Sequence, residues 1–577
     1  GFPLLLTITI GALCFANYTP NTWLSGWDTL HPEWNFSLAF ERIFNGVWRT
    51  DQGLGAVAIQ SHMADLPRVA LLWLLHFVLP PSTLRYAFFF LMLVAGPLGI
   101  YAFARSARLS RSAAFIGSLV YLCNLGPLQH FIVPLEMFAV LYGLFPWLCL
   151  TIIKNKLFYF AFLSFFASAM SHTATLFYAY FAIIVIFMIA LRPKIRVFLT
   201  LLAIILATNA YWLFPNIYAV ITHGQEVREA RVNQLFSPEA FAKNQAFGTI
   251  DNAVILKNFL FDWSIYNPKK EQFEDLMAAW KPHITQLPVQ AIGYGIFMLS
   301  LVGIMAVIRK KSVVGKALIP VWCISFFMLL SGTPPIPHLF EKIATMFPLA
   351  GEALRFPFTK FSILYMVPFA IFAGFGFDAL LTLTARKFFH TIIVIEVSLA
   401  IVITMLPAFT GHLIHPAMRI RYPTAYQEMF DWFSKQNKNE RVAILPNHTF
   451  WNWVYYDWGY QGAGFLQFGI QQPILDRDYD RWNIYNEQYQ RELSYAVYSK
   501  QPTLIRKVLE KYKVTWILFD TSVIAPGDNK NATLAWQIPE LLSAAGLEKT
   551  IAFGANITIY RVPTNQTNLY TSLPKTL

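Results

Sequence analysis

The stretch LRYAFFFLMLVAGPLGIYAFARSARLSR, residues 84–111, decides the fold class of this chain. Residues 84–104 carry a single charge and match the roughly 20 apolar residues that a membrane-spanning helix needs. The following residues 105–111 contain three arginines and no acid. Basic loops of this kind mark the cytoplasmic side of a membrane. The stretch therefore predicts a spanning helix that ends in a cytoplasmic loop.

The same pattern recurs through the first 409 residues. The chain of 577 residues is 56% hydrophobic and 13% charged, about half the charged fraction of a soluble protein. This composition excludes a soluble single domain and a disordered chain, and four cysteines are too few for a disulfide scaffold. We predict eleven membrane spans, at residues 2–16, 84–104, 112–125, 134–153, 157–170, 174–191, 197–215, 288–308, 313–332, 361–384 and 391–409.

Charge sets the orientation of these spans. If the chain starts on the cytoplasmic side, five internal loops hold 14 Lys or Arg residues and no Asp or Glu. The apolar run Val69–Leu79 is too short to span, and counting it as a span would move those loops outside. We therefore expect it to be an interfacial or re-entrant helix. The net charge of +13 reflects membrane topology, and no nucleic-acid partner is predicted.

The polar segments then share the outer face. They comprise a large first loop (17–83), a second loop (216–287), a third segment (333–360) and the tail (410–577). In the tail, predicted strands alternate with predicted helices, which is typical of a small α/β domain. The predicted strands are Arg441–Leu445, Val514–Asp520, Lys549–Phe553 and Ile557–Val562, and the predicted helices are Thr503–Tyr512 and Ile538–Ala545. We thus divide the chain into a transmembrane domain, 1–409, and an extracytoplasmic α/β domain, 410–577.

The segment Phe450–Tyr495 in the tail is rich in Trp and Tyr. Aromatic side chains stack on sugars, and they also anchor proteins at membrane interfaces. Two interpretations are open: a packed junction between the tail and the membrane domain, or a surface that faces a glycan or lipid.

The first outer loop carries most of the residues suited to chemistry. Ordering a loop of more than 60 residues costs conformational entropy, and ordered loops of this length usually have a function. Gly26 and Pro32 flank Asp28, which predicts a fixed turn at that carboxylate. A buried carboxylate with a raised pKa can act as a general base on a hydroxyl group. The alternative is a structural Asx turn or helix cap.

The order of segments resembles the GT-C glycosyltransferase superfamily, which has an N-terminal span, a long outer loop with an early acid, an interfacial helix and paired spans around basic loops. The loop sequences GWDTLHPEWNF (26–36) and QGLGAVAIQSHMADLPR (52–68) are most similar to bacterial arabinofuranosyltransferase-like membrane proteins. A second match is LRFPFTKF (354–361), just outside the tenth span.

The resemblance implies an inverting transferase in the plasma membrane. Its donor would be a polyprenyl-phosphate-linked sugar, and its acceptor an extracytoplasmic glycan, lipid or protein. The early acid of the family corresponds to Asp28, which would be the catalytic base. The family often has a second adjacent acid, but Thr29 follows Asp28 here, so Glu33 is the remaining candidate for that role. Direct displacement with inversion requires only one base, unlike the two-carboxylate hydrolases.

A phosphate leaving group requires cationic stabilisation. Our candidates are Arg355 and Lys360, followed by Arg68 and Arg49; the alternative for all four is anchoring at lipid head groups. Three further loop residues complete the candidate substrate-binding set: His31, His62 and Asp65. No cofactor and no metal site are predicted, because neither an HExxH motif nor a pair of cysteines with ligand spacing occurs. Some members of the superfamily use a divalent cation, which leaves that alternative open.

Two other classes of function compete with a transferase. A transporter or flippase for lipid-linked precursors would show inverted repeats and charges near the membrane midplane, and the sequence shows neither clearly. A non-catalytic membrane assembly protein would need no acid-rich loop. The first outer loop therefore favours the enzyme.

Overall fold

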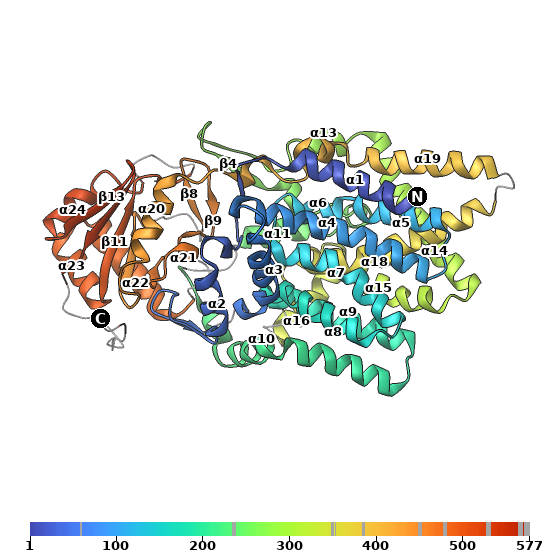
Figure 1. Ribbon diagram of the computed structural model, residues 1–577, viewed down its shortest axis with the longest axis horizontal. Coiled ribbons are helices and arrows are strands. Elements are labelled where there is room, and N and C mark those ends of the chain that lie inside the picture. Colours follow the sequence, from blue (N-terminus) through green and yellow to red (C-terminus); the bar gives the residue numbers. More distant parts are fainter. Residues whose placement is uncertain are drawn as a thin grey trace.

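The protein has a part made of apolar helices and an α/β tail, with the first loop (17–83) lying between them (Figure 1). The computed structural model describes residues 1–57, 61–232, 238–347, 351, 354–383, 387–447, 453–476, 482–526, 532–563 and 569.

Seven helical segments in the described residues are long and apolar enough to cross a membrane. They are α4 (Pro81–Ser106), α7 (Glu136–Ile153), α9 (Ala174–Leu191), α10 (Ile195–Glu229), α14 (Leu287–Lys310), α18 (Pro357–Leu381) and the segment Phe388–His412, which contains most of α19 (Lys387–Ile403). Four shorter apolar helices accompany them: α1 (Phe2–Asn17), α5 (Arg111–Leu122), α8 (Leu157–Ala167) and α15 (Val313–Leu329). Each of the eleven predicted spans corresponds to one of these segments. The predicted non-spanning run lies mainly in α3 (Leu66–His76), which is short.

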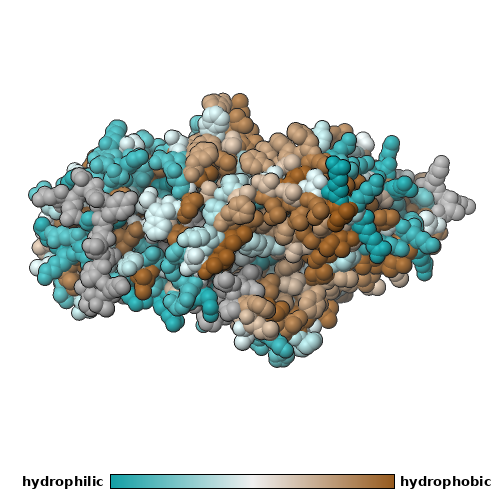
Figure 2. Space-filling model, turned by 90° about the horizontal axis from the view of Figure 1, so that it is seen from below, coloured by the Kyte–Doolittle hydropathy of each residue, from teal (hydrophilic) through white to brown (hydrophobic). Residues whose placement is uncertain are grey.

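Helix α18 forms the centre of the membrane part because α14, α15 and α5 pack around it. Most of its apolar window, 83%, is buried inside the protein, whereas 22% of Phe388–His412 is buried. The latter segment therefore leaves most of its apolar surface to lipid. Figure 2 shows the resulting apolar surface over the helical part, with hydrophilic residues at both ends of the molecule.

The tail contains a five-stranded sheet in the order β10-β7-β11-β14-β13. The strands are β7 (Arg441–Leu445), β10 (Ile474–Leu475), β11 (Val514–Asp520), β13 (Glu548–Phe553) and β14 (Ile557–Arg561). Helix α20 (Thr424–Phe433) covers one face. The other face is covered by α22 (Ile484–Tyr498), α23 (Pro502–Lys511) and α24 (Ile538–Ala544). Because both faces are covered, every residue of β11 is buried.

The α/β class of the tail is therefore confirmed, and its predicted strands and helices are present within one or two residues.

The remaining elements are short. They are α2 (Phe36–Phe44), α6 (Leu125–Phe131), α11 (Pro238–Ala246), α12 (Ile250–Val254), α13 (Lys281–Ile284), α16 (Ile336–Met346), α21 (Leu466–Gly469), β1 (Trp23–Leu24), β2 (Trp48–Arg49), β3 (Ala56–Val57), β4 (Ser264–Asn267), β5 (Gln272–Asp275), β6 (Arg419–Ile420), β8 (Val454–Tyr456), β9 (Gln461–Gly462) and β12 (Val523–Ile524).

The first loop is joined to the tail by backbone pairing. Strand β1 pairs with β6 in antiparallel fashion, and isolated bridges join Trp27 to Gly462 and Gln52 to Ile474. The aromatic segment of the tail packs at this junction, where Tyr456, Tyr460 and Phe465 are at most 2% exposed. Of the two interpretations of that segment, the packed junction fits its described residues between 453 and 476. The proposed boundary at residue 410 thus separates two compositions, but the first loop packs against the tail.

Candidate active site

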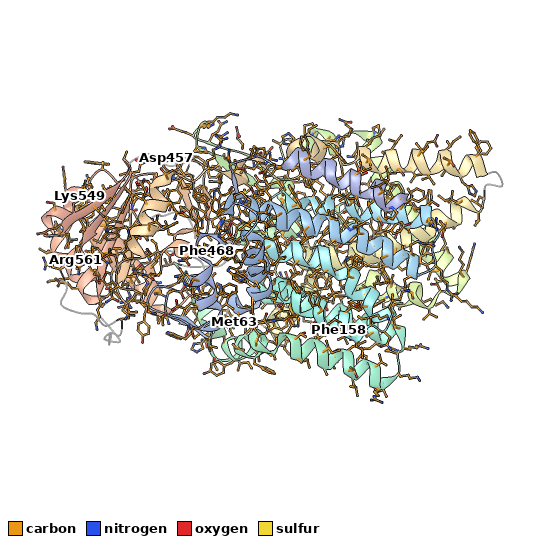
Figure 3. All side chains as sticks on the ribbon, viewed as in Figure 1. Met63, Phe158, Asp457, Phe468, Lys549 and Arg561 are labelled. Atoms are coloured by element: carbon orange, nitrogen blue, oxygen red, sulfur yellow. The ribbon has the colours of Figure 1, made fainter. Side chains whose placement is uncertain are left out.

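A cleft lies between the first loop and the tail, with about 850 Å³ of space that includes its opening to solvent. Its walls come from the first loop, from the start of α3, from the turn before α9 and from the segment 463–468 of the tail. The charged and polar lining residues are Asp28, Thr29, Arg42, Arg49, Asp51, Gln52, His62, Asp65, His172 and Gln467. Figure 3 labels Phe468, a tail residue that lines the cleft and contacts the first loop, with its ring 5.8 Å from that of His31.

Asp28 lies on a strained turn at this cleft. The preceding residues have positive φ, +127° at Gly26 and +50° at Trp27, and the latter is unusual for a residue with a side chain. Burial raises the pKa of the Asp28 carboxyl to about 6; a hydrogen bond from the Trp453 side chain opposes this shift and the negative charge of Glu136 adds to it. A partner so distant in the sequence is unlike the local backbone bond of an Asx turn. The side chain has the character of a base that is ionised near neutral pH.

His31 and Glu33 form a buried pair behind the turn rather than in the cleft wall. His31 Nδ1 lies 3.0 Å from Glu33 Oε1, and His31 Nε2 lies 2.9 Å from Ser25 Oγ and 3.4 Å from Arg85 Nη1. Because a guanidinium only donates, Nε2 is the acceptor and Nδ1 carries the proton, which makes the imidazole neutral. Burial lowers the pKa of His31, with the charge of Arg85 acting in the same direction and that of Glu33 opposing it. The pair thus supports the turn that carries Asp28.

Arg68 is buried in an ion cluster that includes a residue missed by the sequence analysis, Glu136. Arg68 donates to both carboxylate oxygens of Asp65, at 2.7 and 2.5 Å. Glu136 Oε1 lies 3.6 Å from Arg68 Nη1 and 2.6 Å from Arg85 Nη2, and it accepts a hydrogen bond from the Leu30 amide at 3.2 Å. Glu136 is the only acid between Arg68 and Glu226. A single acid in so long a stretch was the sequence signal that Glu136 has a specific structural or functional role.

Arg49 lines the cleft, but its charge is compensated by Asp51. Its Nε and Nη2 lie 2.8 and 2.6 Å from the two carboxylate oxygens of Asp51, and Arg42 Nε approaches the same carboxylate at 3.1 Å. His62, a predicted binding residue, is 3.3 Å from Gln52 Nε2 and packs against the ring of His172. Within the described residues, the cleft therefore contains two arginines that share one aspartate.

Arg355 and Lys360 do not line this cleft. A row of aromatic contacts links them to the Asp28 turn: Trp27 to Trp263 at 6.1 Å, Trp263 to Phe259 at 5.7 Å and Phe259 to Phe356 at 5.3 Å between ring centroids. The Arg355 guanidinium lies over Phe241 at 5.2 Å, and Lys243 lies over Trp263 at 5.9 Å. We refer to Lys243, Arg355 and Lys360 as the cationic group. Its members lie along the aromatic row beyond Trp27, Lys243 at Trp263 and the other two at Phe356.

Lys360 is only 8% exposed, and its Nζ donates to the Phe356 carbonyl at 3.3 Å. Within the described ranges, no carboxylate forms an ion pair with it. No cluster of three His, Cys, Asp or Glu side chains that could hold a metal ion is found in the same ranges.

Comparison with known proteins gives a fold. No protein-family model and no curated protein matches the chain. Among solved structures, arabinofuranosyltransferase AftD from Mycobacteria superposes on 98% of this chain with a TM-score of 0.63 at 15% sequence identity. This chain shares its fold with AftD, as the resemblance to the GT-C superfamily led us to expect. It spans about 40% of the AftD chain.

The archaeal oligosaccharyltransferase of Archaeoglobus fulgidus also matches, over 90% of this chain and 69% of its own, at 11% identity and a lower TM-score of 0.44. The likeness to AftD alone confirms the fold class predicted from the sequence, a polytopic GT-C-like helical protein with an α/β tail.

Proposed function

We propose that this protein is an integral membrane glycosyltransferase. It moves a sugar from a polyprenyl-phosphate-linked donor to a glycan, lipid or protein acceptor on the extracytoplasmic side of the plasma membrane. The observation that carries the proposal is Asp28, a carboxylate with a pKa of about 6 on a strained turn at the wall of a cleft. The GT-C fold shared with AftD supports the same activity.

The proposed reaction is a single inverting displacement. An acceptor hydroxyl in the cleft gives its proton to the Asp28 carboxylate while its oxygen bonds to the anomeric carbon of the sugar. The bond between that carbon and the phosphate oxygen breaks, and the phosphate leaves with the electron pair. One base is sufficient because the phosphate leaves as an anion and needs no proton from a second carboxylic acid, unlike the alcohol leaving group of a glycosidase. Glu33 has no direct part in this scheme, since it is bonded to His31 behind the cleft.

Charge distribution supports placing the acceptor and the phosphate on opposite sides of the turn. In the cleft, Arg42 and Arg49 share Asp51, and Asp28 and Asp65 also line the wall, which suits an uncharged ligand rich in hydroxyl groups better than an anion. The cationic group along the aromatic row suits the phosphate of the donor, since Asp262 pairs with Lys243 only, at 3.3 Å, among its three members in the described residues. Arg355 and Lys360 thus keep the role proposed for them from the sequence, whereas the burial of Arg68 with Asp65 and Glu136 favours a structural role.

Replacing Lys360 by Met is expected to raise the KM for the lipid-linked donor about tenfold, because one charge-assisted bond to phosphate is lost. The KM for the acceptor should change less than twofold. The control is Lys549→Met, which removes an exposed charge at the far edge of the tail (Figure 3). An unchanged donor KM in the Lys360 variant would exclude this lysine from the phosphate site.

The experiment that tests the function uses the purified protein in liposomes with a polyprenyl-phosphate-linked pentose or hexose and a glycan acceptor. Transfer of the sugar in the wild type, together with its loss in Asp28→Asn, supports the proposal. Movement of the labelled lipid across the bilayer without transfer would instead identify a flippase. Neither transfer nor lipid movement, in a folded protein with a full panel of donors, would favour a non-catalytic assembly role.

A further inference from the structure

The tail reaches the Asp28 turn at two independent points. The first is a backbone clamp on Trp27, whose amide donates to the Gln461 carbonyl at 2.8 Å and whose carbonyl accepts from the Ala463 amide at 2.8 Å. Because both backbone groups of Trp27 are bound by the tail, the positive φ of this residue is fixed from outside the first loop.

Gly462 permits this clamp. A Cβ added to Gly462 would lie 2.3 Å from the Trp27 carbonyl oxygen and 2.4 Å from its nitrogen, far inside van der Waals contact. Both neighbours are backbone atoms, which cannot swing aside as the end of a flexible side chain can. Any side chain at this position would therefore push the turn out of its place.

The second point is Trp453, the residue immediately before β8. Its ring lies 4.8 Å from that of Trp27, it is 7% exposed, and its side chain donates a hydrogen bond to the Asp28 carboxylate. A donor to the ionised carboxylate fixes its direction and favours its charged form.

We propose that Gly462 and Trp453 are positioning residues for Asp28, so that the tail is a working part of the active site rather than an appended domain. This inference rests on the proposed function of Asp28 as the base. Trp453 aims the carboxylate, and Gly462 lets the tail hold the turn close to the cleft. In this arrangement the base is in place only when the tail is docked on the first loop.

The substitution of Trp453 removes none of the charged groups near Asp28. They are Glu136 at the start of α7 and, around the cleft, Arg42, Arg49, Asp51, Asp65, His62 and His172. A change in the titration of Asp28 in a Trp453 variant is therefore assigned to the lost hydrogen bond.

The test compares Trp453→Phe with the control Trp458→Phe. Trp458 is also in the tail, but its indole N–H donates to Tyr426 Oη, at 3.2 Å, and not to Asp28. Two quantities are measured against pH: sugar transfer, and labelling of the Asp28 carboxyl by a carbodiimide, read by mass spectrometry. In Trp453→Phe we expect both midpoints to rise by about one pH unit, the size of one hydrogen bond to a charged group. In Trp458→Phe both should stay at the wild-type value.

Gly462→Ala tests the clamp separately. We expect transfer to fall about a hundredfold, while Gly295→Ala, at a site with nothing within 4 Å, leaves transfer unchanged. If the labelling midpoint shifts in Trp453→Phe but neither the wild type nor any variant transfers sugar, the positioning role of Trp453 stands and the proposed function is wrong. Wild-type midpoints in Trp453→Phe, or full transfer in Gly462→Ala, would overturn the inference.

Discussion

Replacing Glu136 by Ala is expected to destabilise the folded protein by about 3 kcal/mol or more, the cost of leaving buried charges without their partner. Glu136 is 2% exposed and neutralises Arg85, which is 1% exposed, and it also approaches Arg68. Arg68 keeps Asp65 in the variant, but Arg85 loses its only ion pair among the described residues. The lost hydrogen bond to Leu30 also frees the backbone two residues after Asp28.

Thermal unfolding in detergent measures this effect, with Glu226→Ala as the control. Glu226 also forms an ion pair, with His223 at 3.0 Å, but both partners are about a third exposed. A surface pair of this kind contributes less than about 1 kcal/mol. Equal Tm values for the two variants would contradict a structural role for the Glu136 cluster.

Replacing Asp28 by Asn is expected to reduce sugar transfer about a thousandfold, the contribution of a positioned general base. The amide keeps the shape of the side chain but cannot accept a proton. Because burial disfavours the carboxylate charge, the variant should be at least as stable as the wild type near pH 7. Loss of activity without loss of stability distinguishes a catalytic residue from a structural one.

The control for this variant is Asp457→Asn in the tail. Asp457 is exposed and lies outside the cleft, so its neutralisation should leave both transfer and Tm unchanged (Figure 3). Transfer by Asp28→Asn within about threefold of this control would assign the proton to another acceptor.

Much of the fold follows from the sequence because apolar length and loop charge are local properties. The eleven apolar runs each correspond to a helix, and the alternation at Arg441–Leu445 and the apolar run Val514–Asp520 each correspond to a strand. Helices α20 and α22 were not predicted, because both mix aromatic with charged residues and so lack a clear apolar pattern. Their packing on the sheet compensates for the weak local signal.

The candidate site was only partly predictable, because contacts across long separations leave no local pattern. A fixed turn at Asp28 is indicated by Gly26 and Pro32, but the positive φ of Trp27 is not, and the hydrogen bond from Trp453 and the clamp at Gly462 come from the tail. Likewise, Asp51 compensates Arg49 only through the loop geometry that brings their side chains together. Glu33 is acidic and close in sequence to Asp28, yet it faces His31, which the spacing alone could not indicate.

The most direct measurement is the pH dependence of sugar transfer from a polyprenyl-phosphate donor by the wild-type protein in liposomes, at a low concentration of acceptor. Because the base must be ionised, transfer should fall as the pH drops through the pKa of Asp28, with a midpoint near 6, and this dependence should vanish together with the activity in Asp28→Asn. A rate that is flat between about pH 5 and 7, or undiminished transfer by Asp28→Asn, would contradict Asp28 as the catalytic base.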